Sequence, residues 1–327
     1  MQQLKANEHI YQLATGHWVP RCLQLIAEVG IADHLGEEPR PVEELAEATN
    51  VSADALARIL RLLSMHDVFL LREGCCEHTP ASRVLRSDHP QSMRAMVRLH
   101  GFCWQSFSML ERSLRTGKIA EADAWPEGIF PYLAAHPDHS AMFNSAMTAK
   151  AHADMAGIIP VYDFSAFAVM ADVGGGRGHI LRAVLNVAPY AKGILFDLPS
   201  VLAEVAPDPS GRIALHPGDF FRDELPKADI YLLSTVIHDW ADPEALAILQ
   251  AVRRAAPATA KVLLLETIVP EGPEPHPAKG LDIHMLATTG GRERTKKEYE
   301  RLLSDAGLMV ARVIPAGRMS VIEATPT

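Results

Sequence analysis

The sequence predicts an α/β fold, with a mostly parallel, doubly wound sheet in residues 161–327 and a smaller, mainly helical domain in residues 1–90. Two observations support this prediction. After residue 161, short apolar runs alternate with segments of helical apolar spacing, which is the order of strands joined by crossover helices. A glycine-rich turn also separates the first such strand from the first such helix. Residues 91–160 are expected to form helices that connect the two domains.

Length and composition place the chain among globular proteins. Its 327 residues suffice for two domains with substantial cores, and 48% of them are hydrophobic. The net charge of −9 disfavours a nucleic-acid surface. No stretch reads as a membrane span, the N-terminus lacks a secretory pattern, and four cysteines are too few for a disulfide framework. We therefore expect a cytoplasmic protein that binds neither nucleic acid nor membranes.

The amino-terminal domain has the order of a winged helix. One helix is expected to end near Gly36, two short helices follow with Ser52 as an N-cap, and a hairpin with Gly74 at its tip forms the wing. The adjacent Cys75 and Cys76 are expected in that turn as free thiols. The segments are 22–35, 41–48, 52–63, 68–72 and 77–79.

Two functions of this domain are compared, DNA binding and assembly. A helix that reads a DNA groove needs exposed basic and amide side chains. The second short helix offers only Arg58 and Arg61 amid apolar residues, and the first is acidic. We therefore expect the domain to bury its apolar surface in a twofold homodimer. The apolar residues ahead of it are Tyr11, Leu13, Trp18 and Val19. A DNA-binding regulator with a degenerate, cofactor-sensing second domain is the alternative.

The glycine-rich turn is typical of a nucleotide-cofactor site. Residues 169–173 read as a buried strand and residues 180–187 as a helix. The glycines that let a ligand lie directly on the main chain are Gly174, Gly176 and Gly178. A dinucleotide pattern would need a glycine at His179, and Asp172 at the loop entrance would repel a pyrophosphate. The turn instead suits a ligand with an ammonium and a sulfonium, which indicates S-adenosylmethionine.

Two later strands lead to acidic residues that suit the same cofactor. Residues 193–196 are followed by Asp197, about 20 residues beyond the loop, where a carboxylate can reach ribose hydroxyls. The strand that begins at Ile213 leads to Asp219 and Phe220. We expect Asp219 to accept a hydrogen bond from the adenine amino group and Phe220 to lie against the ring. Either aspartate alone would be typical of a helix cap or a solvated loop, but their order favours the cofactor site.

The fourth strand, residues 229–237, is expected to run directly into His238. Carboxyl ends of strands line the ligand crevice of open α/β sheets, so His238 is expected to face the cofactor. Asp242 is predicted to cap the following helix, which runs through Arg254. A lone histidine is more often structural, but this position favours a catalytic role.

Six segments together carry a resemblance to a known family. They are the glycine loop and residues 196–201, 218–220, 238–240, 266–272 and 290–295. In this order the chain resembles the small-molecule O-methyltransferases of the plant caffeic acid and hydroxyindole type, which include bacterial members. The resemblance implies a Rossmann-like class I methyltransferase domain, S-adenosylmethionine as cofactor, S-adenosylhomocysteine as product, no metal, and a homodimer.

The resemblance also implies roles for individual residues. His238 would be the general base with Glu266 and Glu293 beside it, although either glutamate could instead form an ion pair with Arg292 or Arg294. Leu198 would join the cofactor site. Ser234 stands where plant members usually carry a lysine that contributes to the cofactor site, so what replaces that contact is open.

Helices in residues 91–160 would roof the substrate pocket. Phe143 and Met147 lie four residues apart on one helix face and match a family segment that lines the cleft, although their spacing alone would indicate a core pair. The resemblance implies further substrate contacts from Trp104, Asp239 and Met285. The substrate is expected to be a small aromatic molecule with a hydroxyl group.

The expected reaction is methyl transfer to that hydroxyl. A phenol with a pKa of about 10 is almost fully protonated at neutral pH, whereas an imidazole with a pKa of about 6.5 is largely available as a base. His238 would take the proton, and a carboxylate on its far ring nitrogen would fix its tautomer and stabilise the imidazolium. Drift of the same domain to hydroxylation or decarboxylation is a second open alternative.

Overall fold

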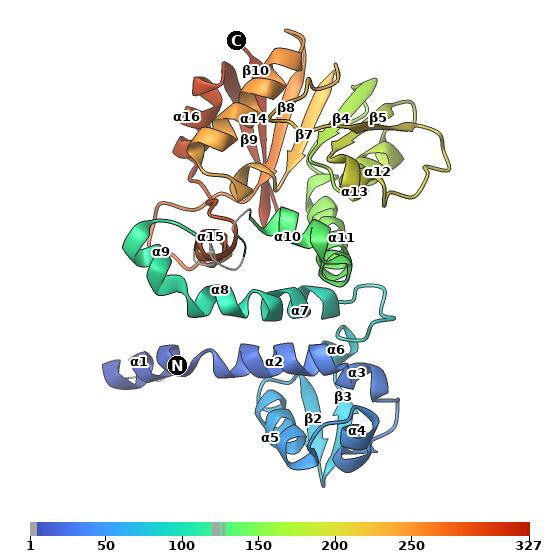
Figure 1. Ribbon diagram of the computed structural model, residues 1–327, viewed down its shortest axis with the longest axis vertical. Coiled ribbons are helices and arrows are strands. Elements are labelled where there is room, and N and C mark those ends of the chain that lie inside the picture. The colour runs from blue at the N-terminus through green and yellow to red at the C-terminus, as the bar shows by residue number, and fades with distance from the viewer. Residues whose placement is uncertain (1–4, 120–124, 126–127) are drawn as a thin grey trace. The chain divides into compact units, whose positions relative to one another are not determined.

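The computed structural model describes residues 5–119, 125 and 128–327, which fold into two compact units (Figure 1). The first unit comprises Met1–Trp104 and Ala141–Ala149, and the second comprises Gln105–Ser140 and Lys150–Thr327. The helical segment 91–160 is therefore shared between the units. Within the described ranges, no helix combines the length and the apolar character that a bilayer crossing requires.

The second unit is built on a seven-stranded sheet in the described residues, with strand order β6-β5-β4-β7-β8-β10-β9 (Figure 1). The first five of these strands are parallel, and β10 and β9 continue the sheet antiparallel. The predicted mostly parallel, doubly wound sheet is confirmed. The strands are β4 (Val169–Val173), β5 (Lys192–Asp197), β6 (Ile213–Pro217), β7 (Ile230–Ser234), β8 (Lys261–Glu266), β9 (Leu308–Ala316) and β10 (Met319–Pro326).

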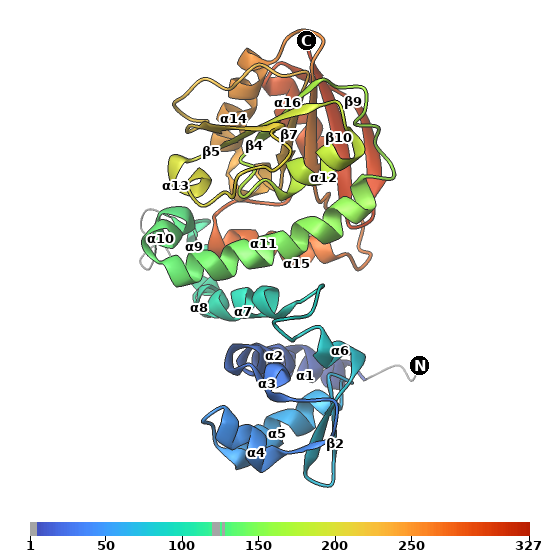
Figure 2. The ribbon, with the colours of Figure 1, turned by 90° about the vertical axis from the view of Figure 1, so that its right-hand side faces the viewer.

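Helices cover both faces of this sheet (Figure 2). On one face α14 and α16 bury Ile248 and Leu303, and on the other α12 buries Leu181 beside Ile158 of α11. The helices are α8 (Trp104–Ser108), α9 (Leu110–Thr116), α10 (Ile129–Ala135), α11 (Pro137–Ile158), α12 (His179–Val187), α13 (Pro199–Leu202), the 3₁₀ turn η1 (Ile237–Asp239), α14 (Asp242–Ala255), α15 (Pro277–Thr288) and α16 (Lys296–Asp305).

The direction of winding reverses between β4 and β7. From β4 the chain moves outward to β5 and β6, and then returns to β7 and β8 on the other side. Open α/β sheets bind ligands where strands diverge in this way, outside their carboxyl ends. The glycine loop follows β4 and His238 follows β7. Because Ser320 pairs with Glu266, the turn between β9 and β10 lies at the same edge.

Two predicted details near this edge were wrong. Strand β7 ends at Ser234 rather than at residue 237, because Thr235 adopts a left-handed conformation with φ 50°. His238 therefore lies in η1 and does not directly follow the strand. Asp242 does not cap α14 but forms its first residue, and its carboxylate pairs with Arg294 instead.

The first unit has the predicted order of helices followed by a hairpin, with two corrections. The helix expected over residues 22–35 is divided at Gly30, which has a left-handed φ of 81°. Cys75 and Cys76 begin β3, and the turn consists of Glu73 and Gly74. The Ser52 hydroxyl caps α5, and Cys22, Cys75 and Cys76 are free thiols. The elements of the first unit are α1 (Ala6–Thr15), α2 (Trp18–Val29), α3 (Ile31–His34), β1 (Arg40–Pro41), α4 (Val42–Ala48), α5 (Ala53–Ser64), β2 (Phe69–Arg72), β3 (Cys75–His78), α6 (Pro80–Arg83) and α7 (Arg94–Phe102).

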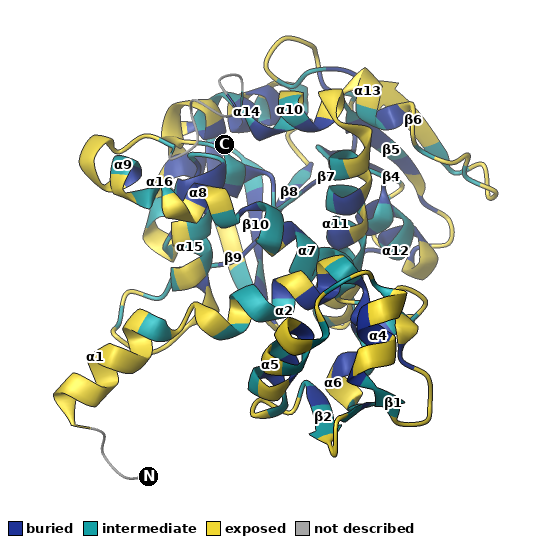
Figure 3. Ribbon diagram, turned by 60° about the horizontal axis from the view of Figure 1, so that its bottom comes forward, coloured by how far each residue is buried: buried dark blue, intermediate teal, exposed yellow. Residues whose placement is uncertain are grey.

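Helix α1 is exposed along its length, and none of its residues is buried (Figure 3). The exposed fractions are 64% for Tyr11, 65% for Leu13 and 50% for Trp18, the first residue of α2. Val19, by contrast, packs against the core of the first unit. An exposed apolar surface of this kind is typical of an interaction site.

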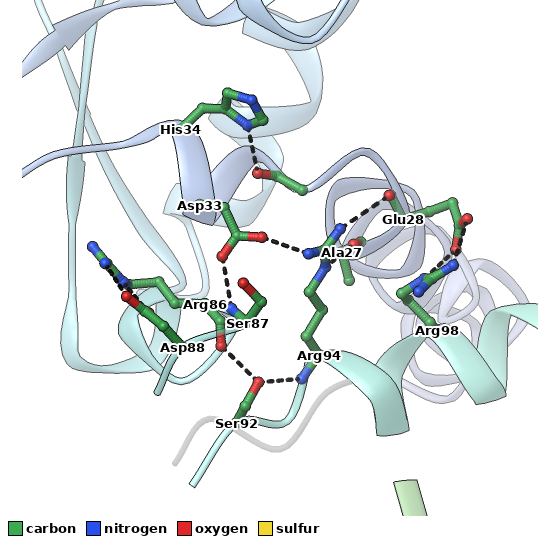
Figure 4. Close-up of polar contacts among 11 residues, drawn as sticks. Ala27, Glu28, Asp33, His34, Arg86, Ser87, Asp88, Ser92, Arg94 and Arg98 are labelled. Carbon is green, nitrogen blue, oxygen red and sulfur yellow. Dashed lines mark hydrogen bonds and ion pairs between the residues drawn. The ribbon is translucent and has the colours of Figure 1, made fainter. Parts of the chain in front are cut away.

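Arginine side chains fasten α7 to the segment formed by α2 and α3 (Figure 4). Arg94 donates through Nε to the Ala27 carbonyl at 2.8 Å, and its guanidinium pairs with Asp33. Arg98 forms a two-pronged ion pair with Glu28, with N–O distances of 2.7 and 3.0 Å. Such paired contacts fix α7 against α2 with more geometric specificity than a single bond would.

Candidate active site

The glycine loop after β4 leaves its main chain open at Gly176. Gly174, Gly176 and Gly178 have φ angles of 68°, 56° and 74°, a region open mainly to glycine. Gly174 donates its N–H to the Phe196 carbonyl at 2.8 Å, and Gly176 donates to Oδ2 of Asp197 at 2.7 Å. A Cβ on Gly176 would meet no heavy atom within 4 Å, so a ligand can approach the backbone there.

Asp172, at the entrance of the loop, is a buried carboxylate without compensation. It is 1% exposed, and neither oxygen has a hydrogen-bond partner among the described residues. Burial and the charge of Asp197 raise the pKa of Asp172 to about 7. A buried carboxylate without partners is costly, and a cationic ligand would relieve that cost. The loop and Asp172 thus fit a cofactor that carries positive charge.

Asp197 and Asp219 end the next two segments at this edge. Asp197 accepts N–H groups on both oxygens, at 2.7 Å from Gly176 and 2.7 Å from Leu198. Each oxygen keeps a second lone pair for a ligand hydroxyl. Burial raises the pKa of Asp197, although these two N–H groups oppose the rise. Asp219 accepts from the Phe221 N–H at 2.9 Å.

Aromatic rings gather around Trp240, which follows the His238 turn. Phe221 and Phe220 meet the Trp240 ring edge-on, with centroids 4.8 and 6.0 Å away. Phe130 of α10 stacks on it at 6.5 Å. The segment that carries Asp219 is thereby packed against the segment that carries His238.

His238 forms a short hydrogen bond with Glu293. Its Nδ1 lies 2.6 Å from Oε1 of Glu293, and its Nε2 lies 3.6 Å from Oδ1 of Asp239. His238 is 6% exposed and Glu293 is 3% exposed. Because a carboxylate accepts at Nδ1, that nitrogen carries the proton and Nε2 is left as the basic nitrogen.

The alternative that Glu293 pairs with a neighbouring arginine was wrong. Arg292 pairs with Asp242 and Glu298, and Arg294 pairs with Asp242.

Glu266, the last residue of β8, holds the turn that carries His238. Its Oε1 accepts the Ile237 N–H at 2.9 Å, while Oε2 has no hydrogen-bond partner in the described part of the chain. Ligand atoms of His238, Glu266 and Glu293 all lie within 4.8 Å of one another. The two glutamates therefore surround one imidazole, from two segments that are distant in the sequence.

These charges change the pKa of the imidazole and of its neighbours. Burial lowers the pKa of His238. The negative charges of Asp239, Glu266 and Glu293 outweigh this effect and raise the pKa to about 9. Burial raises the pKa of Glu266 to about 7, against the opposing charge of His238. The ordinary imidazole pKa assumed from the sequence therefore does not hold, since the sequence does not show how many carboxylates surround the ring.

Lys150 is a cation at this edge that the sequence did not indicate. Its Nζ lies 3.0 Å from Oδ2 of Asp154, whose Oδ1 accepts from Arg318 in the turn between β9 and β10 at 2.6 Å. The charge of Lys150 opposes the rise that burial causes in the pKa of Asp239 and Glu266. No motif marks Lys150 as part of the site. Its ion-pair partner Asp154 lies four residues further on the same helix, and the carboxylates that its charge affects come from other parts of the chain.

The remaining predicted residues divide between the units. Ser234 is half-buried at the end of β7, and Met285 is buried in α15. Phe143 and Met147 belong to the first unit, where they pack against a buried cluster that includes Leu99. Trp104 also lies there, with the Arg21 guanidinium 5.6 Å from its ring centre.

Comparison with known proteins places this geometry in a family. Residues 107–309 match the model of the O-methyltransferase domain, and residues 11–88 match that of the O-methyltransferase dimerisation domain. A phenazine O-methyltransferase of Lysobacter antibioticus is 38% identical over 97% of this chain and 95% of the relative. A 3-amino-4-hydroxybenzoate 4-O-methyltransferase of Streptomyces cremeus is 34% identical over 93% and 86%.

A solved structure has the same fold with ligands bound. An O-methyltransferase from neocarzinostatin biosynthesis, in complex with S-adenosylmethionine and 2-hydroxy-5-methyl naphthoic acid, superimposes with a TM-score of 0.82. It is 31% identical, and the match covers 95% of this chain and 96% of that one. The predicted resemblance is confirmed, and the chain belongs to the O-methyltransferase family.

Proposed function

We propose that this enzyme transfers a methyl group from S-adenosylmethionine to a phenolic hydroxyl of a small aromatic substrate, with His238 as general base. The observation that carries this proposal is the buried pair of His238 and Glu293 beside the point where the winding of the sheet reverses. The relatives support the substrate class, because their names and ligands are aromatic.

The residues present fit the cofactor. Asp172 offers an uncompensated buried negative charge, the main chain at Gly176 is open, and Asp197 has lone pairs for ribose hydroxyls. Asp219 and Phe220 would hold the adenine, and Leu198 would flank it. When bound, S-adenosylmethionine supplies an electrophilic methyl group on a sulfonium.

His238 would then take the proton of the substrate hydroxyl at Nε2. Its pKa of about 9 lies close to the value of about 10 for a free phenol, so the proton transfer is nearly balanced. Glu293 fixes the tautomer through Nδ1 and stabilises the imidazolium that forms. Glu266 keeps the turn in place through the Ile237 N–H. A cation bound among these carboxylates would lower the pKa of His238 toward neutrality.

The same three side chains are also of a kind that binds divalent cations. We favour the base over a metal centre, because the short bond between Nδ1 and Glu293 already uses one ring nitrogen and one carboxylate of this group. Activity that is unchanged after treatment with EDTA supports this choice. Activity lost with EDTA and restored by a divalent cation contradicts it.

We also propose that the first unit forms the homodimer. The match of residues 11–88 to a dimerisation domain and the exposed apolar residues of α1 support this. The alternative of a DNA-binding surface is not favoured, since the first turn of α4 carries the acidic residues Glu43 and Glu44.

The test is incubation of the purified protein with S-adenosylmethionine labelled at its methyl carbon and a panel of aromatic acceptors. The panel contains a hydroxyphenazine, 3-amino-4-hydroxybenzoate, a dihydroxynaphthoate and N-acetylserotonin, each with its deoxy analogue. Label transferred to an acceptor but not to its deoxy analogue supports O-methylation. Label transferred equally to both, or an acceptor that is hydroxylated or decarboxylated without gaining label, contradicts it.

A further inference from the structure

Residues 291–294 hold the turn that carries His238 through hydrogen bonds and close packing. The N–H of Arg292 donates to the His238 carbonyl at 2.8 Å. Gly291 lies so close to this turn that a Cβ there would stand 2.0 Å from the His238 oxygen. This close packing requires a glycine at position 291. It also places Glu293, two residues later, beside the imidazole.

The side chain of Arg294 also holds this turn. It is 1% exposed, and its Nη1 donates to the Ile237 carbonyl at 3.0 Å while its Nη2 donates to the Trp240 carbonyl at 2.9 Å. These carbonyls lie on either side of His238. The positive charge is balanced by Asp242, which accepts from Nε at 3.1 Å and from Nη2 at 2.8 Å.

The main chain of Arg294 is fixed as well. Residue 294 forms a parallel bridge with Ile268, and its carbonyl accepts the Val269 N–H at 3.0 Å. These residues continue from β8, which ends in Glu266. The base turn and both glutamates are therefore tied to one another through Arg294.

We propose that Arg294 is a positioning residue that fixes the ring of His238 against Glu293. The proposal rests on the proposed function, since it assigns Arg294 a role in setting the geometry of the base. Only a guanidinium has donors that diverge in one plane toward three acceptors; the ammonium of a lysine is a compact point charge. Without the guanidinium, at least one of the Ile237 and Trp240 carbonyls loses its hydrogen-bond donor, and the turn can shift.

The substitution Arg294→Lys tests this, because it keeps the positive charge and removes the diverging donors of the guanidinium. A matched control is Arg253→Lys, since Arg253 of α14 also donates to two carbonyls, those of Gly307 and Thr327, away from the base. The first readout is the Nδ1 proton of His238 in NMR spectra of the full-length protein labelled with ¹⁵N-histidine. This signal is assigned by its loss in His238→Gln.

We expect Arg294→Lys to shift or broaden the His238 ring-proton signal, while Arg253→Lys leaves it unchanged. Turnover with an acceptor from the panel should fall by up to about 100-fold in Arg294→Lys, the scale of a misplacement of about 1 Å, with unchanged affinity for S-adenosylhomocysteine. A ring-proton signal like that of the wild type in Arg294→Lys overturns the proposal.

Two further outcomes separate this proposal from the proposed function. A shifted signal with unchanged turnover shows that Arg294 orients the ring but that His238 is not the base, which overturns the catalytic part. If Arg294→Lys does not fold, Asp242→Ala replaces it, because this change removes the exposed anchor of the Arg294 guanidinium while Arg292 keeps its pairing with Glu298. A smaller shift of the same signal then supports the proposal, and an unchanged signal contradicts it.

Discussion

The Nδ1 atom of His238 lies 2.6 Å from Oε1 of Glu293, 55 residues further along the chain. This bond leaves Nε2 as the basic nitrogen and places a buried negative charge behind the ring. The carboxylates of Glu266 and Asp239 also lie near the ring, and together these negative charges raise the pKa of the imidazole to about 9.

Activity should rise with pH. A base acts only when deprotonated, and the pKa of His238 is raised, so most of the imidazole is protonated at neutral pH. We expect kcat/KM, which reports the free enzyme, to increase about tenfold per pH unit below 9 and to level off above it. An ascending limb with a midpoint at or below pH 6.5 contradicts this.

Glu293→Gln should move that limb to lower pH. The substitution removes a negative charge that raises the pKa of His238, so the imidazole loses its proton more readily. The plateau should nevertheless be lower, because the imidazolium is less well stabilised. The measurement is the same pH profile, and a limb that moves to higher pH would be the wrong sign.

Cofactor binding should release protons. Asp172 has a pKa of about 7, so it is partly protonated at neutral pH, and a cationic ligand favours its ionised form. Affinity for S-adenosylmethionine should therefore increase from pH 6 to pH 8. Calorimetry in two buffers of different ionisation enthalpy counts the protons, and Asp172→Asn should release fewer. Equal release by both proteins, or proton uptake, contradicts the role of Asp172.

Asp197→Ala should weaken affinity for S-adenosylhomocysteine by about 1 to 3 kcal/mol, since ribose hydroxyls lose an acceptor and the Gly176 N–H loses its partner. Asp163→Ala serves as control, because Asp163 caps an exposed loop through Ser165. Calorimetry with both variants gives the difference. Equal affinities of the two variants would remove Asp197 from the cofactor site.

The double substitution Tyr11→Ser and Leu13→Ser should convert a dimer into monomers. Both side chains are about two-thirds exposed on α1, and burial of such area is the main driving force of association. Met309→Ser is the matched control, as Met309 is 60% exposed on the second unit. Light scattering gives the mass of each variant, and a persistent dimer of the double variant shows that α1 is not the interface.

Much of the second unit could be predicted from the sequence because its signals are local. The strand 169–173, the glycine loop and the helix after it follow one another without interruption, and β5 and β6 repeat the pattern. The order of these segments was enough to place Asp172, Asp197 and His238 at one edge of the sheet.

What the sequence did not show depends on contacts between distant residues. Nothing local marks Thr235 as left-handed, so the predicted fourth strand was too long. Arg294 donates to the carbonyls of residues 237 and 240, which lie far from it in the chain. The carboxylates that the charge of Lys150 affects are also distant in sequence, so no spacing rule links them. The pKa of His238 likewise depends on carboxylates that only the fold brings together.

The turnover rate of His238→Ala at neutral pH tests the central claim most directly. The account predicts a fall of about 100- to 10,000-fold, with affinity for S-adenosylmethionine nearly unchanged. His238→Gln should not restore activity, whereas a pH near the phenol pKa of about 10 should do so in part, because phenolate then forms without a base. Wild-type turnover of His238→Ala at neutral pH would contradict the assignment of His238 as the general base.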